Sequence, residues 1–158
     1  IKYRFKRRVM MVSDVTKISR GVIMHQVNCQ NVMGAGVAKA LYTKYPQVKE
    51  KFHQLATKNE YNTPLKRFGL VQPVKINDQL VVFNSFSQLY YGRDKDRVYT
   101  NEKALIANLN KLDTWAKEHN LPAYVPARIG CGLAGGNWNR IKRHIENHTD
   151  IIIVDPNN

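Results

Sequence analysis

The sequence has few cysteines and no long apolar run. Its two cysteines, Cys29 and Cys131, lie in amide-rich or glycine-rich segments without the CxxC spacing of a metal site. We therefore expect thiols in a reducing, cytoplasmic compartment and no bound metal or cofactor. No apolar stretch approaches the ~20 residues of a membrane-spanning helix, and the first residues lack a signal-peptide pattern, so no membrane partner is expected.

Acidic residues are also scarce, because 12 Asp and Glu face 25 Lys and Arg, for a net charge of +13. This excess predicts affinity for an anion, which can be a nucleotide, a nucleic acid or an acidic protein. A basic surface that only aids solubility is an equally good interpretation. The basic residues gather within 2–8 and 140–143, but no basic strand or helix carries the interleaved aromatic residues typical of a nucleic-acid binder.

The 158 residues fit one domain, 1–158, because the sequence has no repeat, linker or low-complexity tract and 43% of it is apolar. It begins with Ile1 rather than Met, as a piece of a longer or processed product would. Apolar periodicity predicts strands over 3–12, 21–27, 68–76, 79–84, 123–126 and 150–154. It predicts helices over 36–45, 46–55 and 100–120, and a last helix that carries Trp138, Ile141 and Ile145.

This order favours an α/β fold, in which a three-layer α/β/α sandwich surrounds a central mixed, mostly parallel six-stranded sheet. The apolar segment 21–27 is expected to be a central strand. Asn77 and Asp78 predict a hairpin turn, and Pro73 places the strand before it near an edge. Thr100 is the expected N-cap of the long helix.

Two glycine-rich loops, 34–36 and 130–136, each leave a strand and open a helix. That arrangement points bare backbone N–H groups at an anion. Neither loop has a GxGxxG fingerprint or the Lys-Ser/Thr pair of a P-loop. A diphosphate can instead lie across both loops without a metal, although either loop alone is explained equally well as a tight turn. Asp14, which follows the first strand, can accept from a base amine or cap a turn.

The runs HQVNCQNVMGAGVAKAL (25–41) and ARIGCGLAGGNW (127–138) resemble the macrodomain family, whose members bind ADP-ribose. The resemblance covers nearly the whole chain. It is strongest to the branch of ADP-ribose-1''-phosphate phosphatases and hydrolases that release ADP-ribose from glutamate. Compact macrodomains of this kind occur in bacteria and their viruses, which makes such an origin the expected one.

The resemblance implies that the partner is ADP-ribose, a derivative of it, or an ADP-ribosylated protein. It assigns the adenine amine to Asp14, and the distal ribose to Asn28 and the first loop. The second loop would wrap the diphosphate, with strand-end residues lining the pocket. The implied ligand-binding residues are Asp14, Val15, Gly34, Ala35, Gly36, Val37, Ser85, Phe86, Ile129, Gly130, Cys131, Gly132, Leu133 and Ala134.

The residues expected to catalyse a reaction differ from those of the glutamate hydrolases. Those enzymes use a Lys and an Asp at the positions that Phe86 and Ala134 occupy here. The phosphatases are associated with a His at the strand end, where this chain has His25. The resulting hypothesis is a phosphatase of ADP-ribose-1''-phosphate with His25 and Asn28 as catalytic residues.

Three alternatives stay open: a non-catalytic reader or sponge of ADP-ribose, a hydrolase of protein- or nucleic-acid-linked ADP-ribose, and a nucleic-acid binder. His25 can equally be a strand histidine that donates to the backbone. Tyr90, Tyr91 and Gly92 are candidates for a mobile cover over the distal ribose.

Overall fold

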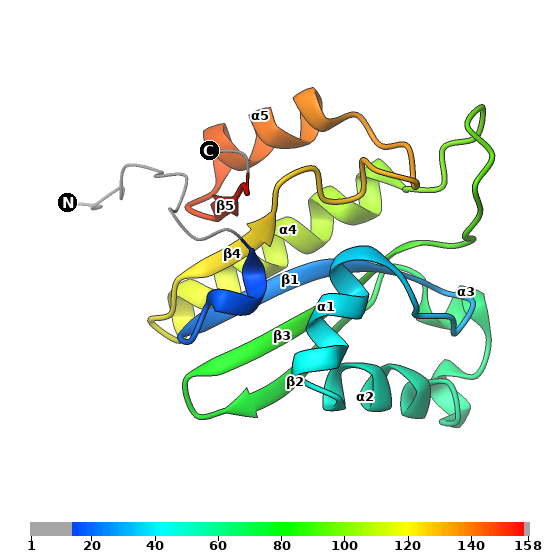
Figure 1. Ribbon diagram of the computed structural model, residues 1–158, viewed down its shortest axis with the longest axis horizontal. Helices are drawn as coiled ribbons and strands as arrows, with labels where there is room; N and C mark the ends of the chain where they lie inside the picture. The colour runs from blue at the N-terminus through cyan, green and yellow to red at the C-terminus, as the bar shows by residue number, and fades with distance from the viewer. Residues whose placement is uncertain (1–13, 157–158) are drawn as a thin grey trace.

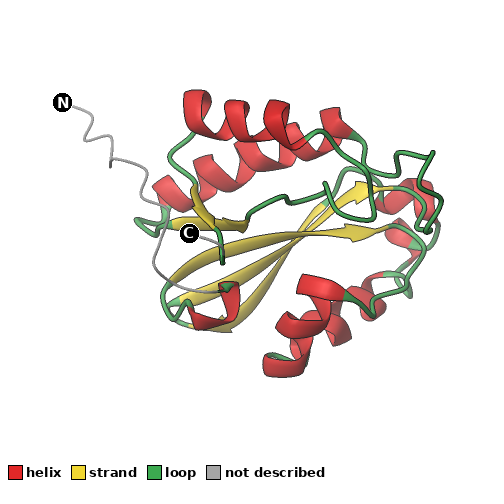
Figure 2. Cartoon of the chain, turned by 45° about the horizontal axis from the view of Figure 1, so that its top comes forward, coloured by secondary structure: helices red, strands yellow, loops and turns green. Residues whose placement is uncertain are grey.

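The computed structural model describes residues 14–156, and these form a sheet with helices on both faces (Figures 1 and 2). The five strands described have the order β2-β3-β1-β4-β5. Strands β1, β3, β4 and β5 run parallel, and β2 pairs with β3 in the antiparallel sense. The strand bounds are β1 Gly21–Asn28, β2 Val71–Asn77, β3 Leu80–Gln88, β4 Ala123–Pro126 and β5 Ile152–Val154.

Two helical layers cover the sheet, which confirms the predicted three-layer α/β/α architecture (Figure 2). Helices α1 and α2 pack on one face, and α4 and α5 pack on the other. The helix bounds are α1 Gly36–Lys44, α2 Gln47–Leu55, α3 Pro64–Arg67, α4 Glu102–Glu118 and α5 Trp138–His148, with short 3-10 turns η1 Val15–Lys17 and η2 Asn59–Tyr61. No helix in the part described is both long and apolar enough to cross a membrane.

Strand β1 is central, as its apolar sequence predicts, and its side chains alternate between the two cores. Ile23 and Val27 belong to the core under α1 and α2, and Val22 and Met24 belong to the core under α4 and α5. A strand buried on both faces needs apolar residues at consecutive positions, which is the pattern of this segment. The central position of β1 places its carboxyl end between those of β3 and β4.

The antiparallel hairpin is confirmed at Asn77, whose side chain accepts from the Gln79 N–H at 2.8 Å, and Pro73 lies on the edge strand β2. The expected strand over 79–84 is too short, because β3 continues to Gln88 alongside β1. The strand expected over 68–76 begins only at Val71. Before it lies α3, a turn of helix that Thr63 caps and Pro64 starts.

The remaining differences lie at element ends. Asn101, and not Thr100, caps α4 by accepting from the Ala104 N–H at 2.9 Å. Strand β5 spans Ile152–Val154 within the 150–154 expected. The sixth strand expected over 3–12 and the basic cluster within 2–8 lie outside the residues described.

Candidate functional site

The two glycine-rich loops lie at the same end of the sheet (Figure 1). One follows β1 and leads into α1, and the other follows β4 and leads into α5. Because β1 and β4 are neighbouring parallel strands, their carboxyl ends meet at one edge, where ligands of open α/β sheets collect. The structure therefore brings the two predicted loops to the same edge of the sheet.

Side-chain hydrogen bonds shape the first loop from within. The Asn28 Oδ1 accepts from the N–H groups of Gln30 (3.0 Å) and Val32 (3.4 Å), and its Nδ2 donates to the Val32 carbonyl at 2.7 Å. From α3, the buried Arg67 donates to the Cys29 carbonyl at 2.6 Å. The Asn28 amide is thus occupied in closing its own turn, which argues against the catalytic part expected for it.

The start of α1 offers hydrogen-bond donors to solvent. Ala35 at the N-cap has no side chain that could accept from the first turn, and Gly36 adopts φ +60°. The N–H groups of Gly36, Val37 and Ala38 have no acceptor among the described residues. Gly34 to Val37 are all exposed, so this helix N-terminus can receive an anion.

The second loop is folded back on itself around one carbonyl. The Gly130 oxygen accepts from the Gly136 N–H at 2.8 Å and from the Thr100 hydroxyl at 2.6 Å. A Cβ on Gly136 would lie 2.5 Å from that oxygen, so only glycine allows this close approach. Within 14–156, no acceptor is found for the N–H groups of Gly132, Leu133 and Ala134.

The segment between β3 and α4 packs against the second loop. The N–H groups of Tyr99 and Thr100 both donate to the Ala134 carbonyl, at 2.7 and 3.0 Å. The Arg97 guanidinium lies over the rings of Tyr90 and Tyr99, 5.4 and 5.1 Å from their centres. Tyr90 and Tyr91 are exposed, so this segment presents aromatic side chains beside the loop.

Exposed large apolar side chains concentrate at the loop end of the sheet. Six of the seven in the described chain belong to the two glycine-rich loops, the start of α1 and the segment after β3, and the seventh is Leu65 on α3. The six are Val32, Val37, Tyr90, Tyr91, Val98 and Leu133. Such clustering is typical of a ligand-binding or partner-binding surface.

Asp14 and Val15 precede Thr16, whose carbonyl accepts from Lys44 of α1. Asp14 is exposed and caps η1 by accepting from the Thr16 N–H at 2.8 Å, which keeps its pKa below the usual value through its bonds to Thr16. Val15 is buried in the core. An open hollow of about 460 Å³ runs from Thr16 along α1 to Gly36, and it connects Asp14's neighbourhood with the first loop.

His25 lies in the interior, 1% exposed, where its Nε2 contacts the Asn84 Oδ1 at 2.5 Å. Burial lowers the pKa of the imidazole to about 4, and the hydrogen bond to Asn84 offsets this only in part. A ligand held by the exposed loops cannot touch this ring in the observed arrangement. The geometry therefore favours a structural part for His25 over the catalytic one.

Three residues expected to line the pocket have buried side chains instead. Phe86 is fully buried and stacks on Phe52 at 5.6 Å, under α2. Ser85 is fully buried on the other face and bonds Ser87 and Asn108. Ile129 belongs to the core under α4 and α5. Sequence alone placed them correctly along the chain but not on the correct side of the strand or loop.

Neither cysteine has the properties of a nucleophile. Burial raises the pKa of the Cys29 and Cys131 thiols to about 11 each, so both are protonated near neutral pH. Cys29 is fully buried, and Cys131 is half-buried with its Sγ directed to the Ile129 carbonyl. Within 14–156, no group of three or more His, Cys, Asp or Glu side chains could hold a metal ion.

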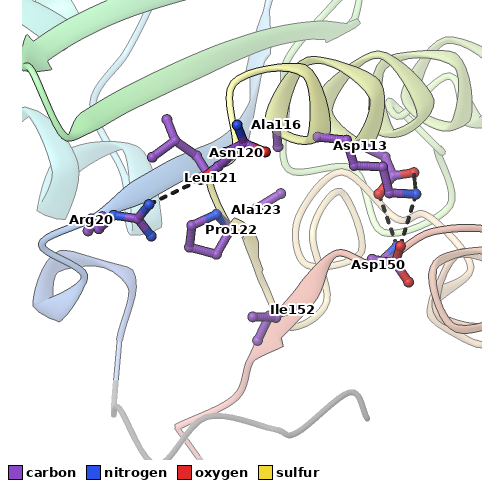
Figure 3. A pocket seen from close by; sticks show the side chains of 10 residues that line it. Arg20, Asp113, Ala116, Asn120, Leu121, Pro122, Ala123, Asp150 and Ile152 are labelled. Atoms are coloured by element: carbon purple, nitrogen blue, oxygen red, sulfur yellow. Dashed lines mark hydrogen bonds and ion pairs between the residues drawn. The ribbon is translucent and has the colours of Figure 1, made fainter. Parts of the chain in front are cut away.

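A larger cavity, of about 590 Å³, lies elsewhere, between the end of α4 and the starts of β4 and β5 (Figure 3). Its charged groups bond one another or the backbone. Lys117 contacts Asp113 and Asp150 at 2.9 Å each, and Arg20 donates to the Asn120 carbonyl at 3.0 Å. Size alone would favour this cavity, but its Lys117, Asp113, Asp150 and Arg20 side chains already have protein partners.

Sequence reasoning missed three residues that hold the loops. These are Arg67, which donates to the first loop, Thr100, which donates to Gly130 in the second, and Gln26, which donates to Thr100. The only signal in the sequence was a polar residue inside or next to an apolar element. Thr100 showed that signal and was interpreted as a helix cap.

No protein-family model matches the chain. An uncharacterized 17.5 kDa protein from the tk-vs intergenic region of Enterobacteria phage T4 is 26% identical over 137 residues, 84% of each chain. A protein of unknown function from Bacteroides thetaiotaomicron superposes with a TM-score of 0.77 at 27% identity, over 92% of this chain and 95% of that one.

Two further similar structures are described as macrodomains. The macrodomain of Mycobacterium tuberculosis DarG has a TM-score of 0.65 at 21% identity, over 90% of this chain and 91% of that one. A mutant macrodomain of Oceanobacillus iheyensis with ADPR has a TM-score of 0.61 at 18% identity, over 90% and 79%. The chain therefore shares the fold of these macrodomains.

Proposed function

We propose that the chain binds ADP-ribose, or a derivative of it, across its two glycine-rich loops. The observation that carries this proposal is the set of six backbone N–H groups with no acceptor among the described residues. Three belong to the start of α1 (36–38) and three to the second loop (132–134). Backbone donors at a helix start and in a glycine-rich loop suit a diphosphate without any metal.

The similar structures support the identity of the ligand. The mutant macrodomain from Oceanobacillus iheyensis, which shares the fold, was solved with ADPR. Apolar side chains around the loops, among them Val37 and Leu133, can cover the nucleoside and ribose parts, which a bare phosphate would not need.

Isothermal titration calorimetry with ADP-ribose tests the proposal. We expect saturable binding of one ligand per chain, and competition by ADP but not by free ribose, because the diphosphate makes the backbone contacts. Absence of heat with ligand at about 1 mM, a concentration that detects even weak binding, would contradict the proposal.

Phosphate removal from ADP-ribose-1''-phosphate is our second proposal. Phe86 is buried and Ala134 has no carboxylate, so the Lys and Asp of the glutamate hydrolases have no counterpart here, which among enzymatic options favours the phosphatase. A buried His25 gives that reaction little support as its base. Phosphate release by the wild type, compared with His25→Gln, tests it, and binding without release would leave a reader of ADP-ribose.

A further inference from the structure

A chain of buried polar side chains connects the central strand to the second loop. The Gln26 Nε2, on β1, donates to the Thr100 Oγ1 at 2.8 Å. The Thr100 hydroxyl in turn donates to the Gly130 carbonyl at 2.6 Å. Thr100 is 7% exposed, and Gln26 is half-buried. Such a polar chain is uncommon at the edge of an apolar core unless each of its members is needed.

Each member of this chain is oriented by a second partner. Ser87 donates to the Gln26 Oε1 at 2.8 Å, which fixes the direction of the amide, and the amide nitrogen also donates to Gln88 at 3.1 Å. At the loop, the Gly130 oxygen receives a second donor, the Gly136 N–H. A Cβ on Gly130 would lie 3.0 Å from the Gln26 Oε1, so glycine permits this contact.

The same contacts determine where the unpartnered donors of the second loop point. Gly132, Leu133 and Ala134 lie between Gly130 and Gly136. The Gly136 N–H donates to the Gly130 oxygen and so closes this segment into a loop. Thr100 also donates its backbone N–H to the Ala134 carbonyl at 3.0 Å. One residue therefore holds the loop at both its base and its tip.

We propose that Gln26 and Thr100 are positioning residues, which hold the second loop in the conformation that presents its backbone N–H groups to a diphosphate. The inference rests on the proposed function for its consequence on binding, but the loop geometry itself can be tested without a ligand. Preorganised donors bind an anion without the cost of ordering the loop, so loosening the loop lowers affinity.

The test compares Thr100→Val with Thr149→Val. Thr149 is also a buried threonine whose hydroxyl donates to a backbone carbonyl, that of Ile145 at 2.8 Å, but it lies at the end of α5. We expect Thr100→Val, which removes both hydrogen bonds of the hydroxyl, to weaken ADP-ribose binding about tenfold, and Thr149→Val to leave it within about twofold. Thr100→Ser keeps the hydroxyl and should restore binding.

Hydrogen–deuterium exchange without ligand gives the second measurement. The hydrogen-bonded N–H groups of the loop, those of Cys131, Gly135 and Gly136, should exchange faster in Thr100→Val and in Gln26→Leu, but not in Thr149→Val. Unchanged exchange of this loop in Thr100→Val would overturn the inference, whether or not the wild type binds ADP-ribose. Equal losses of affinity in Thr100→Val and Thr149→Val would overturn it too, because they would indicate general destabilisation. Failure of the wild type to bind would contradict the proposed function only.

Discussion

At one end of the sheet lie the two glycine-rich loops, and at the other lies the larger cavity, between α4 and the starts of β4 and β5 (Figures 1 and 3). The cavity end has charged residues, yet Lys117 spans two carboxylates and Arg20 bonds a carbonyl. The loop end also has an ion pair, between Arg140 on α5 and Glu102 on α4 at 2.9 Å, but six of its backbone N–H groups have no acceptor in 14–156.

At the cavity end the charged side chains are paired within the protein, whereas at the loop end the backbone N–H groups are available to a ligand. Backbone donors at a helix start and in a glycine-rich loop that have no protein acceptor are available to an anionic ligand. Cavity volume contains no such information. Apolar exposure agrees with this distinction, because Val98 and Leu133 at the loop end are 63% and 65% exposed, whereas Ala123 and Ala116 at the cavity end are buried.

The strongest test of this comparison places the same substitution at each end. In Gly136→Ala the new Cβ would lie 2.5 Å from the Gly130 oxygen, and in Gly21→Ala it would lie 2.6 Å from the Pro122 oxygen. Both variants must shift backbone, and overpacking of this kind typically costs about 1–3 kcal/mol, or about five- to 150-fold in an equilibrium. We expect Gly136→Ala to lose about a hundredfold in ADP-ribose affinity by calorimetry.

Gly21→Ala is the matched control for the loop variant. It should lower the melting temperature because Gly21 also has φ +136°, while its ADP-ribose affinity stays within about twofold of the wild type once folded. If the cavity end were the binding site, the two results would be exchanged. Equal affinities in both variants would remove the second loop from the site.

Sequence reasoning predicted the loops because their signal is local: an apolar strand, glycines and a helix that follow one another along the chain. It did not predict which face a side chain takes when a strand is apolar on both sides, as at Ser85 and Phe86 on β3. The length of β3 was missed for another reason. Its last residues, Ser85 to Gln88, include polar ones, which end the apolar pattern although the backbone still pairs with β1.

Contacts between distant segments could not be predicted at all. Arg67 reaches Cys29 across 38 positions, and Thr100 reaches Gly130 across 30. Nothing in the residues near Arg67 indicates a carbonyl partner in another loop. The supports of the site, unlike its glycines, exist only once the sheet has brought their segments together.

The pH dependence of stability tests whether the His25 side chain, on β1, lies in the interior or is accessible from the loop end. Its pKa is about 4 in the folded chain and has the ordinary value of 6.5 in the unfolded chain, because burial disfavours the charged ring. Between these values only the unfolded chain binds the proton. Stability is therefore full above pH 6.5 and falls as the pH drops through 4, by about 3 kcal/mol in total.

Urea unfolding at several pH values between 7 and 4 measures this slope. His25→Gln lacks the titrating ring, so its stability should depend less on pH than that of the wild type in this range. A histidine that faced a ligand in the solvent-exposed loops would titrate near 6.5 in both states, and the two slopes would then coincide. That outcome would return His25 to the list of possible catalytic residues.

The smallest effect is expected at the cavity end, at Lys117. Its bonds to Asp150 and Asp113 raise the pKa of its ammonium, so the stability that it contributes is complete below the usual value of 10.5 and is lost as the pH rises through the raised one. The Lys117 side chain is 47% exposed, so solvent screens the pairs, and Lys117→Met should lower the free energy of unfolding by only about 1 kcal/mol at pH 7.

The control is Lys103→Met. Lys103 is an exposed lysine of the same helix with no ion pair to a described carboxylate, so its substitution should change the free energy of unfolding less. Neither variant should alter ADP-ribose affinity, since the cavity end satisfies its own charges; a loss of affinity specific to Lys117→Met would mean that the two ends of the sheet are coupled.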